Sequence, residues 1–124
     1  MNSDNTNPPE LKARTKAFAL RIVRLYVSLP KKIEAQVLGK QLLRSGTSVG
    51  AQYWEAQRAK SDADFINKVE GALQELEESG YWLELLADAE IVPVTRLAPL
   101  LKETDELIAI LVTIVRRTKD QERC

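Results

Sequence analysis

The chain has 124 residues, of which 44% are hydrophobic and 29% are charged, and its formal net charge is zero. These values are typical of a single globular domain with its own core. The sequence contains no histidine, which excludes Ser-His-Asp and Cys-His nucleophilic systems and histidine-ligated zinc or di-iron sites. A carboxylate or lysine catalyst stays open, but we expect no catalytic residue, no metal and no cofactor.

Other features of the composition predict a cytoplasmic protein with no membrane contact. No run of about 18 consecutive apolar residues could form a membrane span. The polar start MNSDNTNPPE lacks the basic and apolar regions of a secretory signal. Cys124 is the single cysteine, so the chain cannot form an internal disulfide, which favours a reducing compartment.

Apolar residues recur at helical spacing through four segments, and nothing alternates for long enough to predict a sheet. We expect a disordered tail over 1–9, helices over 10–29, 34–59, 62–89 and 95–118, and a C-terminal tail over 119–124. Pro30 and Pro93 interrupt the pattern. Ser61 and Thr95 are candidate N-caps. Because the connections are short, the prediction is an all-α, antiparallel up-down four-helix bundle.

Each predicted helix has one apolar stripe that should form the core. The stripes contain Leu11, Phe18, Ile22, Leu25 and Leu29; Leu38, Leu42, Ser45, Val49, Tyr53 and Ala56; Phe65, Val69, Ala72, Leu76, Leu83 and Leu86; and Leu100, Thr104, Leu107, Leu111 and Ile114. Further apolar residues lie beyond the stripes, namely Leu20, Val23, Val27, Ile108, Val112 and Val115. This surplus predicts burial in a homo-oligomer, or else a wide stripe in a small core.

Charge is unevenly distributed along the chain. Residues 1–69 contain 12 Lys/Arg and 6 Asp/Glu, a net charge of +6, whereas residues 70–124 contain 6 and 12, a net charge of −6. This asymmetry has two explanations. The oppositely charged halves of one bundle, or of two subunits, attract each other, or the basic half forms a surface that binds nucleic acid. For the second case the candidate phosphate contacts are Arg14, Arg21, Arg24, Lys31, Lys32, Lys40 and Arg44.

The stretch RSGTSVGAQYWE, residues 44–55, resembles a phosphate-binding loop at first sight. Its glycines are spaced four positions apart and no lysine follows Gly50, so it does not fit the P-loop pattern. Within the predicted helix 34–59, Gly39, Gly46 and Gly50 fall on one narrow stripe, which predicts close approach of another helix. Leu43 and Trp54 flank that stripe. These five residues are the predicted helix-packing and oligomer interface, although Trp54 could instead cover the end of the bundle.

Charged residues on the opposite flank predict a polar network between the second and third helices. Arg44 and Glu55 are too far apart to pair within one helix, so each needs a partner elsewhere. The third helix offers three partners, Asp64, Lys68 and Glu75, with Asp64 and Lys68 spaced for an i,i+4 pair. A carboxylate catalytic pair that includes Glu55 is the less favoured alternative.

The motifs LLRSGTSVGAQYWEAQRAKSDADFINKV and ALQELEESGYWLELL resemble the bacterial four-helix-bundle family first noted in intervening sequences of large-subunit ribosomal RNA genes. The resemblance covers residues 10–118. This chain departs from the family pattern at Gln52 and Trp54. The resemblance implies a left-handed bundle in a homo-oligomeric ring, with pentamers among relatives, and no established enzymatic activity. A related bundle assists the reverse transcriptase of diversity-generating retroelements, which favours RNA or DNA binding by analogy.

The leading hypothesis is therefore a non-enzymatic, self-assembling bundle that binds structured RNA through its first two helices. The second is an adaptor or accessory subunit for a protein encoded nearby, without direct nucleic-acid contact. A small enzyme is the third.

Overall fold

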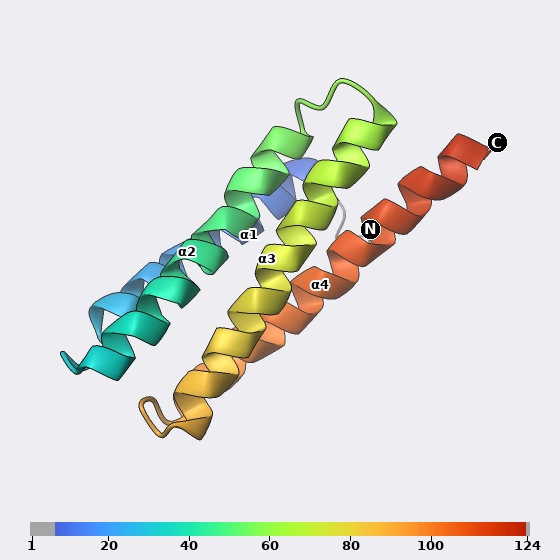
Figure 1. The fold of residues 1–124 in the computed structure, drawn as a ribbon. Helices are drawn as coiled ribbons and strands as arrows, with labels where there is room; N and C mark the ends of the chain where they lie inside the picture. The colour runs from blue at the N-terminus through green and yellow to red at the C-terminus, as the bar shows by residue number, and fades with distance from the viewer. Residues whose placement is uncertain (1–6, 124) are drawn as a thin grey trace.

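The computed structural model describes residues 7–123, which form four helices and no strand. The helices are α1 (Pro8–Val27), α2 (Ile33–Ala56), α3 (Asp62–Asp88) and α4 (Val94–Arg123). Consecutive helices run in opposite directions along one long axis (Figure 1). The predicted all-α four-helix bundle is confirmed.

The helices pack unequally. The most extensive contact joins α2 to α3, while α1 packs on α2 and α4 packs on α3. Contact between α1 and α4 is slight. The bundle therefore consists of two helical hairpins joined along α2 and α3, with a thin seam between the first and last helices.

Side-chain caps close the N-terminal ends of α1 and α3. Asn7 caps α1, and its side-chain oxygen accepts a hydrogen bond from the Glu10 N–H at 3.1 Å. Pro8 and Pro9 occupy the first turn, where a missing N–H costs nothing, so their assignment to a disordered tail is wrong. Residues 1–6 of that predicted tail lie outside the described residues. Ser61 caps α3 as predicted, accepting from the Asp64 N–H at 3.1 Å.

The fourth helix differs from its predicted bounds at both ends. Thr95 is not its N-cap, because the N–H groups of Arg96 and Leu97 already bond to the Pro93 carbonyl and the helix begins at Val94. At the other end the helix continues to Arg123, so the predicted tail over 119–124 is wrong for residues 119–123. Those residues are Lys, Asp, Gln, Glu and Arg, which tolerate helix and include no glycine or proline to stop it.

The second and third helices each end in a tight backbone turn. The second helix ends at Ala56, three residues earlier than predicted, because the N–H groups of Arg58 and Ala59 bond three residues back in 3₁₀ fashion. After α3, Glu90 has φ 59°, a left-handed conformation that is uncommon outside glycine. This conformation lets the N–H groups of Ile91 and Val92 bond back to the Leu86 carbonyl, which ends the helix.

The predicted core stripes are confirmed. Every residue in them is buried except Leu38 and Phe65, which are partly buried. Of the surplus apolar residues, Val115 is buried within the same chain, and Ile108 and Val112 are partly buried. The three on α1 are exposed: Leu20, Val23 and Val27.

Two buried hydroxyls lie at the contact between α2 and α3. Ser79 Oγ is 3.1 Å from Ser45 Oγ and 2.8 Å from the Glu75 carbonyl oxygen, and both serines are fully buried. Both groups therefore have polar partners, which removes the cost of burying them. Their small size also suits close packing of these two helices.

Candidate functional site

The glycine stripe of α2 packs against α1 of the same chain. A Cβ added at Gly46 would lie 2.8 Å from Cγ1 of Ile22, and one at Gly50 would lie 3.3 Å from Oγ1 of Thr15. Gly39 faces Tyr26 and Leu29 in the same way. The close helix approach thus occurs inside the monomer, so this stripe does not require a second subunit.

The two residues beside the stripe have different surroundings. Leu43 is partly buried and packs against the core. Trp54 is 47% exposed and lies on the outer side of the α1–α2 hairpin. The monomer therefore accounts for much of the predicted oligomer interface, and Trp54 is the member that stays accessible.

Arg14 is committed to α4. Its Nε lies 2.7 Å from Oε2 of Glu103, and its Nη2 lies 2.8 Å from the other oxygen of that carboxylate and 2.6 Å from Oε1 of Glu106. The hydrogen bond to Glu103 is the largest of the effects that raise the pKa of Arg14 well above its usual range. Arg14 was a candidate phosphate contact, and its charge is already neutralised by two carboxylates.

Arg44, another candidate phosphate contact, is committed to α3. Its guanidinium lies 3.2 Å from Glu75 and 2.5 Å from Glu78. Lys68 and Glu55 form a second link between these helices at 3.3 Å. The sequence reasoning did not include Glu78, although it lies one helical turn after Glu75 and could have been found from that spacing.

Asp64 does not join this network. Its carboxylate accepts a hydrogen bond from the Lys60 N–H at 3.3 Å, in the turn before α3. The expected i,i+4 pair with Lys68 is not formed, because Lys68 pairs with Glu55 instead. Four of the five predicted network residues therefore connect α2 with α3, and Asp64 orders the start of α3.

The remaining candidate cations lie on one hairpin. Between residues 7 and 32 the chain carries seven Lys/Arg and one acid, a net charge of +6. Five candidates make no ion pair with any described residue: Arg21, Arg24, Lys31, Lys32 and Lys40. They belong to α1, the α1–α2 turn and the first half of α2. Lys12 and Lys16 of α1 are further cations of this hairpin, and sequence reasoning did not single them out.

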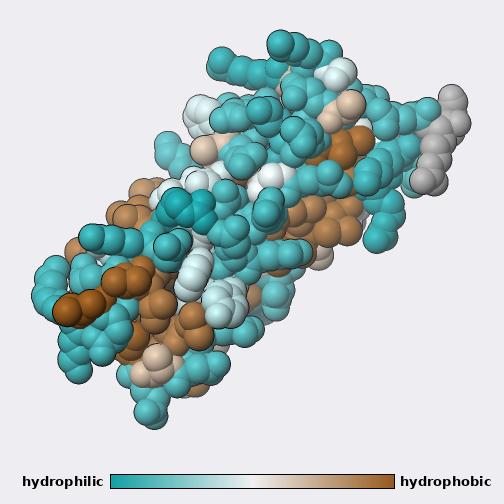
Figure 2. All heavy atoms as spheres, viewed as in Figure 1, coloured by the Kyte–Doolittle hydropathy of each residue, from teal (hydrophilic) through white to brown (hydrophobic). Residues whose placement is uncertain are grey.

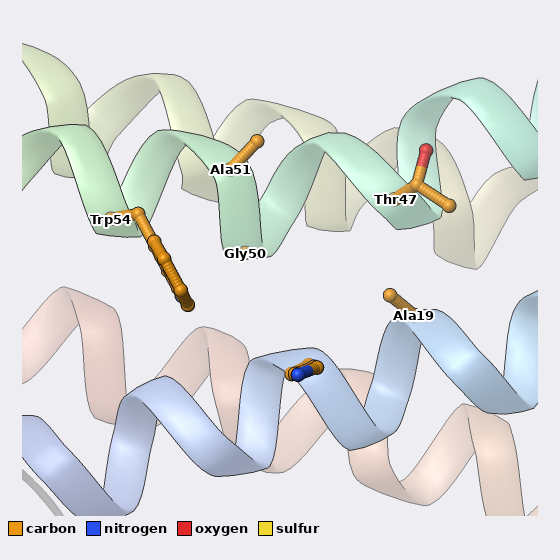
Figure 3. Close-up of a pocket in the computed structure, with 6 residues that line it drawn as sticks. Ala19, Thr47, Gly50, Ala51 and Trp54 are labelled. Carbon is orange, nitrogen blue, oxygen red and sulfur yellow. The ribbon is translucent and has the colours of Figure 1, made fainter.

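A hollow of about 420 Å³ lies between α1 and α2 on the outer side of this hairpin. Its lining consists of Lys16, Ala19, Thr47, Gly50, Ala51 and Trp54. Trp54 projects from α2 toward α1 at one end, and Thr47 and Ala19 lie at the other end (Figure 3). The Lys12 ammonium lies 3.9 Å from the centre of a Trp54 ring, a cation–π contact.

Exposed apolar residues gather near the α1–α2 turn. Val27 is 69% exposed, Ile33 is 82% exposed and Val37 is 55% exposed. Figure 2 shows hydrophobic side chains reaching the surface at the end of the bundle that carries this turn. An apolar group of this kind beside cations is typical of an interaction surface.

The opposite hairpin is acidic. A hollow between α3 and α4 has a floor that includes Leu101 and Ile108, and its edge carries the carboxylates of Glu77, Glu84 and Asp105. Among residues 7–123, no group of three or more histidine, cysteine or carboxylate side chains is arranged to hold a metal ion. No helix within that range is long and apolar enough to cross a membrane.

Comparison with known families decides the affiliation of the chain. The family described as 23S rRNA-intervening sequence protein matches residues 10–113. The chain belongs to this family. The family predicted from the helix-two and helix-three motifs is thereby confirmed.

A solved structure agrees with this assignment. The chain is similar to a protein with unknown function from the S23 ribosomal protein family of Bacteroides thetaiotaomicron, whose crystal structure was determined at 1.70 Å. The two are 40% identical with a TM-score of 0.83, and the match covers 88% of this chain and 97% of the other. No curated protein matches the chain. The relative thus shares this bundle, and it is described as a protein with unknown function.

Proposed function

We propose that this protein is non-enzymatic and binds structured RNA through the cationic hairpin of α1, the α1–α2 turn and the first half of α2. One observation carries the proposal: residues 7–32 have a net charge of +6, and of their cations only Arg14 is ion-paired with a described residue. Unpaired lysines and arginines on one surface attract phosphates and release counterions on binding. Such contacts position a nucleic acid rather than read its sequence.

The ion pairs divide the candidate residues into two groups. Lys31 and Lys32 are exposed in the turn, and neither is ion-paired with a residue between 7 and 123, so both can contact phosphates. Arg44 holds two carboxylates of α3, so a phosphate would have to displace them. We therefore expect the turn lysines to contribute to RNA affinity and Arg44 to contribute little.

Fluorescence anisotropy with a labelled ribosomal RNA fragment over a series of salt concentrations tests this proposal. Replacing Lys31 and Lys32 together with glutamine should weaken binding and reduce the slope of log K against log salt by roughly 0.7–0.9 for each lost contact. Arg44→Gln is the matched control and should leave the slope unchanged. Absence of binding at low salt, or equal slopes for all variants, would refute the proposal.

We also propose that the protein self-associates, with the pentamer implied by the family resemblance as the expected form. The exposed apolar residues on the outer side of α1 and the start of α2 support this, because burying them would stabilise an assembly. Sedimentation or light scattering should give a mass several times the 14.0 kDa of one chain. Replacing Val27 and Val37 with glutamine should lower that mass. A wild-type mass equal to one chain would rule out self-association.

The same apolar residues favour the second candidate function, an adaptor for another protein. Ile33 and Val37 lie close in sequence to the turn lysines, so one surface combines apolar and cationic groups. A partner with an acidic, partly apolar face would fit it. Recovery of a stable protein partner without nucleic acid from purified complexes would favour the adaptor over the RNA-binding protein.

A further inference from the structure

The Trp54 indole has one covered face and one open face. Lys12 lies over the ring and lines a second hollow of about 260 Å³ on that side, together with Glu55, Gln57 and Arg58. Lys12 does not line the larger hollow, where Trp54 forms one wall. Figure 3 shows the indole edge-on, with Thr47 and Ala19 on the same side of its plane. One aromatic face therefore looks along an open hollow.

The floor of that hollow leaves room for a flat group. Gly50 and Ala51 present almost no side chain, and Ala19 on α1 is equally small. A planar ring could lie against the indole without moving any of these residues. Base–aromatic stacking uses this geometry, and it tolerates any base because each has a π-face.

The charges around Trp54 suit a phosphate. Lys16 lines the larger hollow, Arg58 lines the smaller one, and neither makes an ion pair with a described residue. Glu55 is the acid beside them, and Lys68 already pairs with it. The net charge is therefore positive on both sides of the indole.

We propose that this hollow binds an unstacked base of a single-stranded nucleic-acid segment. The base stacks on the open face of Trp54 and its phosphate lies against Lys16. This inference rests on the nucleic-acid binding proposed above and adds a defined base site to it. Structured RNA offers such bases in its loops and bulges, where they can be turned outward.

A second copy of the chain fits this hollow less well. Burying Trp54 against the same hairpin of a second copy would also desolvate the Lys12 and Lys16 ammonium groups, which is costly because residues 7–32 of that copy carry a net charge of +6 and offer few matched acids. Within the α1–α2 hairpin, the most exposed large apolar residues are Val27, Ile33 and Val37, and they lie at its far end instead. Trp54 is therefore free for another ligand even when those residues are covered.

Tryptophan fluorescence gives a direct test. Titration of the full chain with a uridine octanucleotide at low salt should quench Trp54, and Trp54→Ala should remove the quenching and weaken binding about 5- to 100-fold. Trp54→Phe should restore part of the affinity, because a smaller ring still stacks. Trp82, the other tryptophan, provides the background signal in both variants.

Tyr81→Ala is the matched control. Tyr81 is 57% exposed, but it lines the same hollow as Glu77 and Glu84, whose negative charges should repel a phosphate. Its replacement should leave binding of the octanucleotide unchanged. Circular dichroism of each variant checks that the helices are intact.

Four results would overturn the inference. If Trp54→Ala binds as tightly as the wild type while the Lys31 and Lys32 variant does not, the base site is wrong and the proposed RNA binding stands. If no nucleic acid binds at low salt, both are wrong. Equal quenching by uridine monophosphate would assign the hollow to free nucleotides. A shift of Trp54 emission on dilution without nucleic acid would mean that a second copy covers it.

Discussion

Arg14 of α1 and Glu103 of α4 form an ion pair with two hydrogen bonds, Nε to Oε2 at 2.7 Å and Nη2 to Oε1 at 2.8 Å. The pair lies across the seam where α1 and α4 touch only slightly. Both side chains are largely shielded, with 25% and 17% of their surface exposed. Their geometry and burial distinguish this pair from the surface ion pairs of the bundle.

Replacing Arg14 with methionine should lower the free energy of unfolding by about 1–3 kcal/mol, because Glu103 would lose its charged partner in a partly buried position. Arg44→Met is the control. Arg44 is half-exposed, so its loss should cost no more than about 1 kcal/mol. Urea unfolding measures both. Equal costs for the two variants would mean that the Arg14 pair contributes no more than a surface pair.

Two glycines should respond to alanine with opposite signs. At Gly46 a Cβ would lie 2.8 Å and 3.0 Å from two branch carbons of Ile22, so the close contact should outweigh the gain in helix propensity of about 1 kcal/mol. At Gly80 the nearest atom, Cγ2 of Thr104, lies 3.6 Å away, which is ordinary contact. Gly80→Ala should therefore stabilise the bundle by up to about 1 kcal/mol. Thermal unfolding of the pair tests this, and a stabilising Gly46→Ala would contradict it.

Replacing Glu90 with glycine should stabilise the protein. It has φ 59° directly after the C-cap of α3, where glycine carries no steric penalty and where a negative side chain opposes the helix dipole. Glu90→Gly should raise the free energy of unfolding by about 0.5–1 kcal/mol, as measured by denaturant titration. Glu84→Gly, inside α3, should instead lower it by about 1 kcal/mol.

The stability of the bundle should fall in alkali through Tyr53. Burial raises the pKa of Tyr53 above its ordinary value of 10.0. The unfolded chain therefore loses this proton first, and the free energy of unfolding falls as pH rises from the unfolded pKa through the folded one. Tyr53→Phe should show a smaller fall than the wild type over that range. Identical pH profiles for the two proteins would refute this.

The helices could be predicted because a buried stripe leaves a periodic trace in the sequence, as Ile22 and Leu107 illustrate. The sequence does not show which helix or subunit packs against a given stripe. The glycines of α2 predicted a close approach, but an approaching α1 and an approaching subunit require the same small residues. The partner of Arg14 was equally hidden, since Glu103 lies 89 positions away and only the folded chain brings them together.

Residue identity alone also did not predict which cations form ion pairs with carboxylates of the other helices. Arg14 and Lys31 both stand in a basic segment, yet Arg14 contacts two carboxylates and Lys31 pairs with no carboxylate in residues 7–123. Trp54 could be recognised as an exception to its family, but the hollow beside it depends on how α1 and α2 cross. Such features belong to the packing of two helices and cannot be assigned to either helix alone.

The thin seam between α1 and α4 has a consequence for how the bundle opens. Because α1 is anchored mainly to α2, it can detach as a unit while the α2–α3 contact persists. Amide hydrogens of α1 should then exchange with solvent through a partial opening, ahead of those in the middle of α2 and α3. Detachment of α1 would also move its cations. A bound polyanion that contacts these cations together with those of α2 would therefore stabilise the closed bundle and slow this opening.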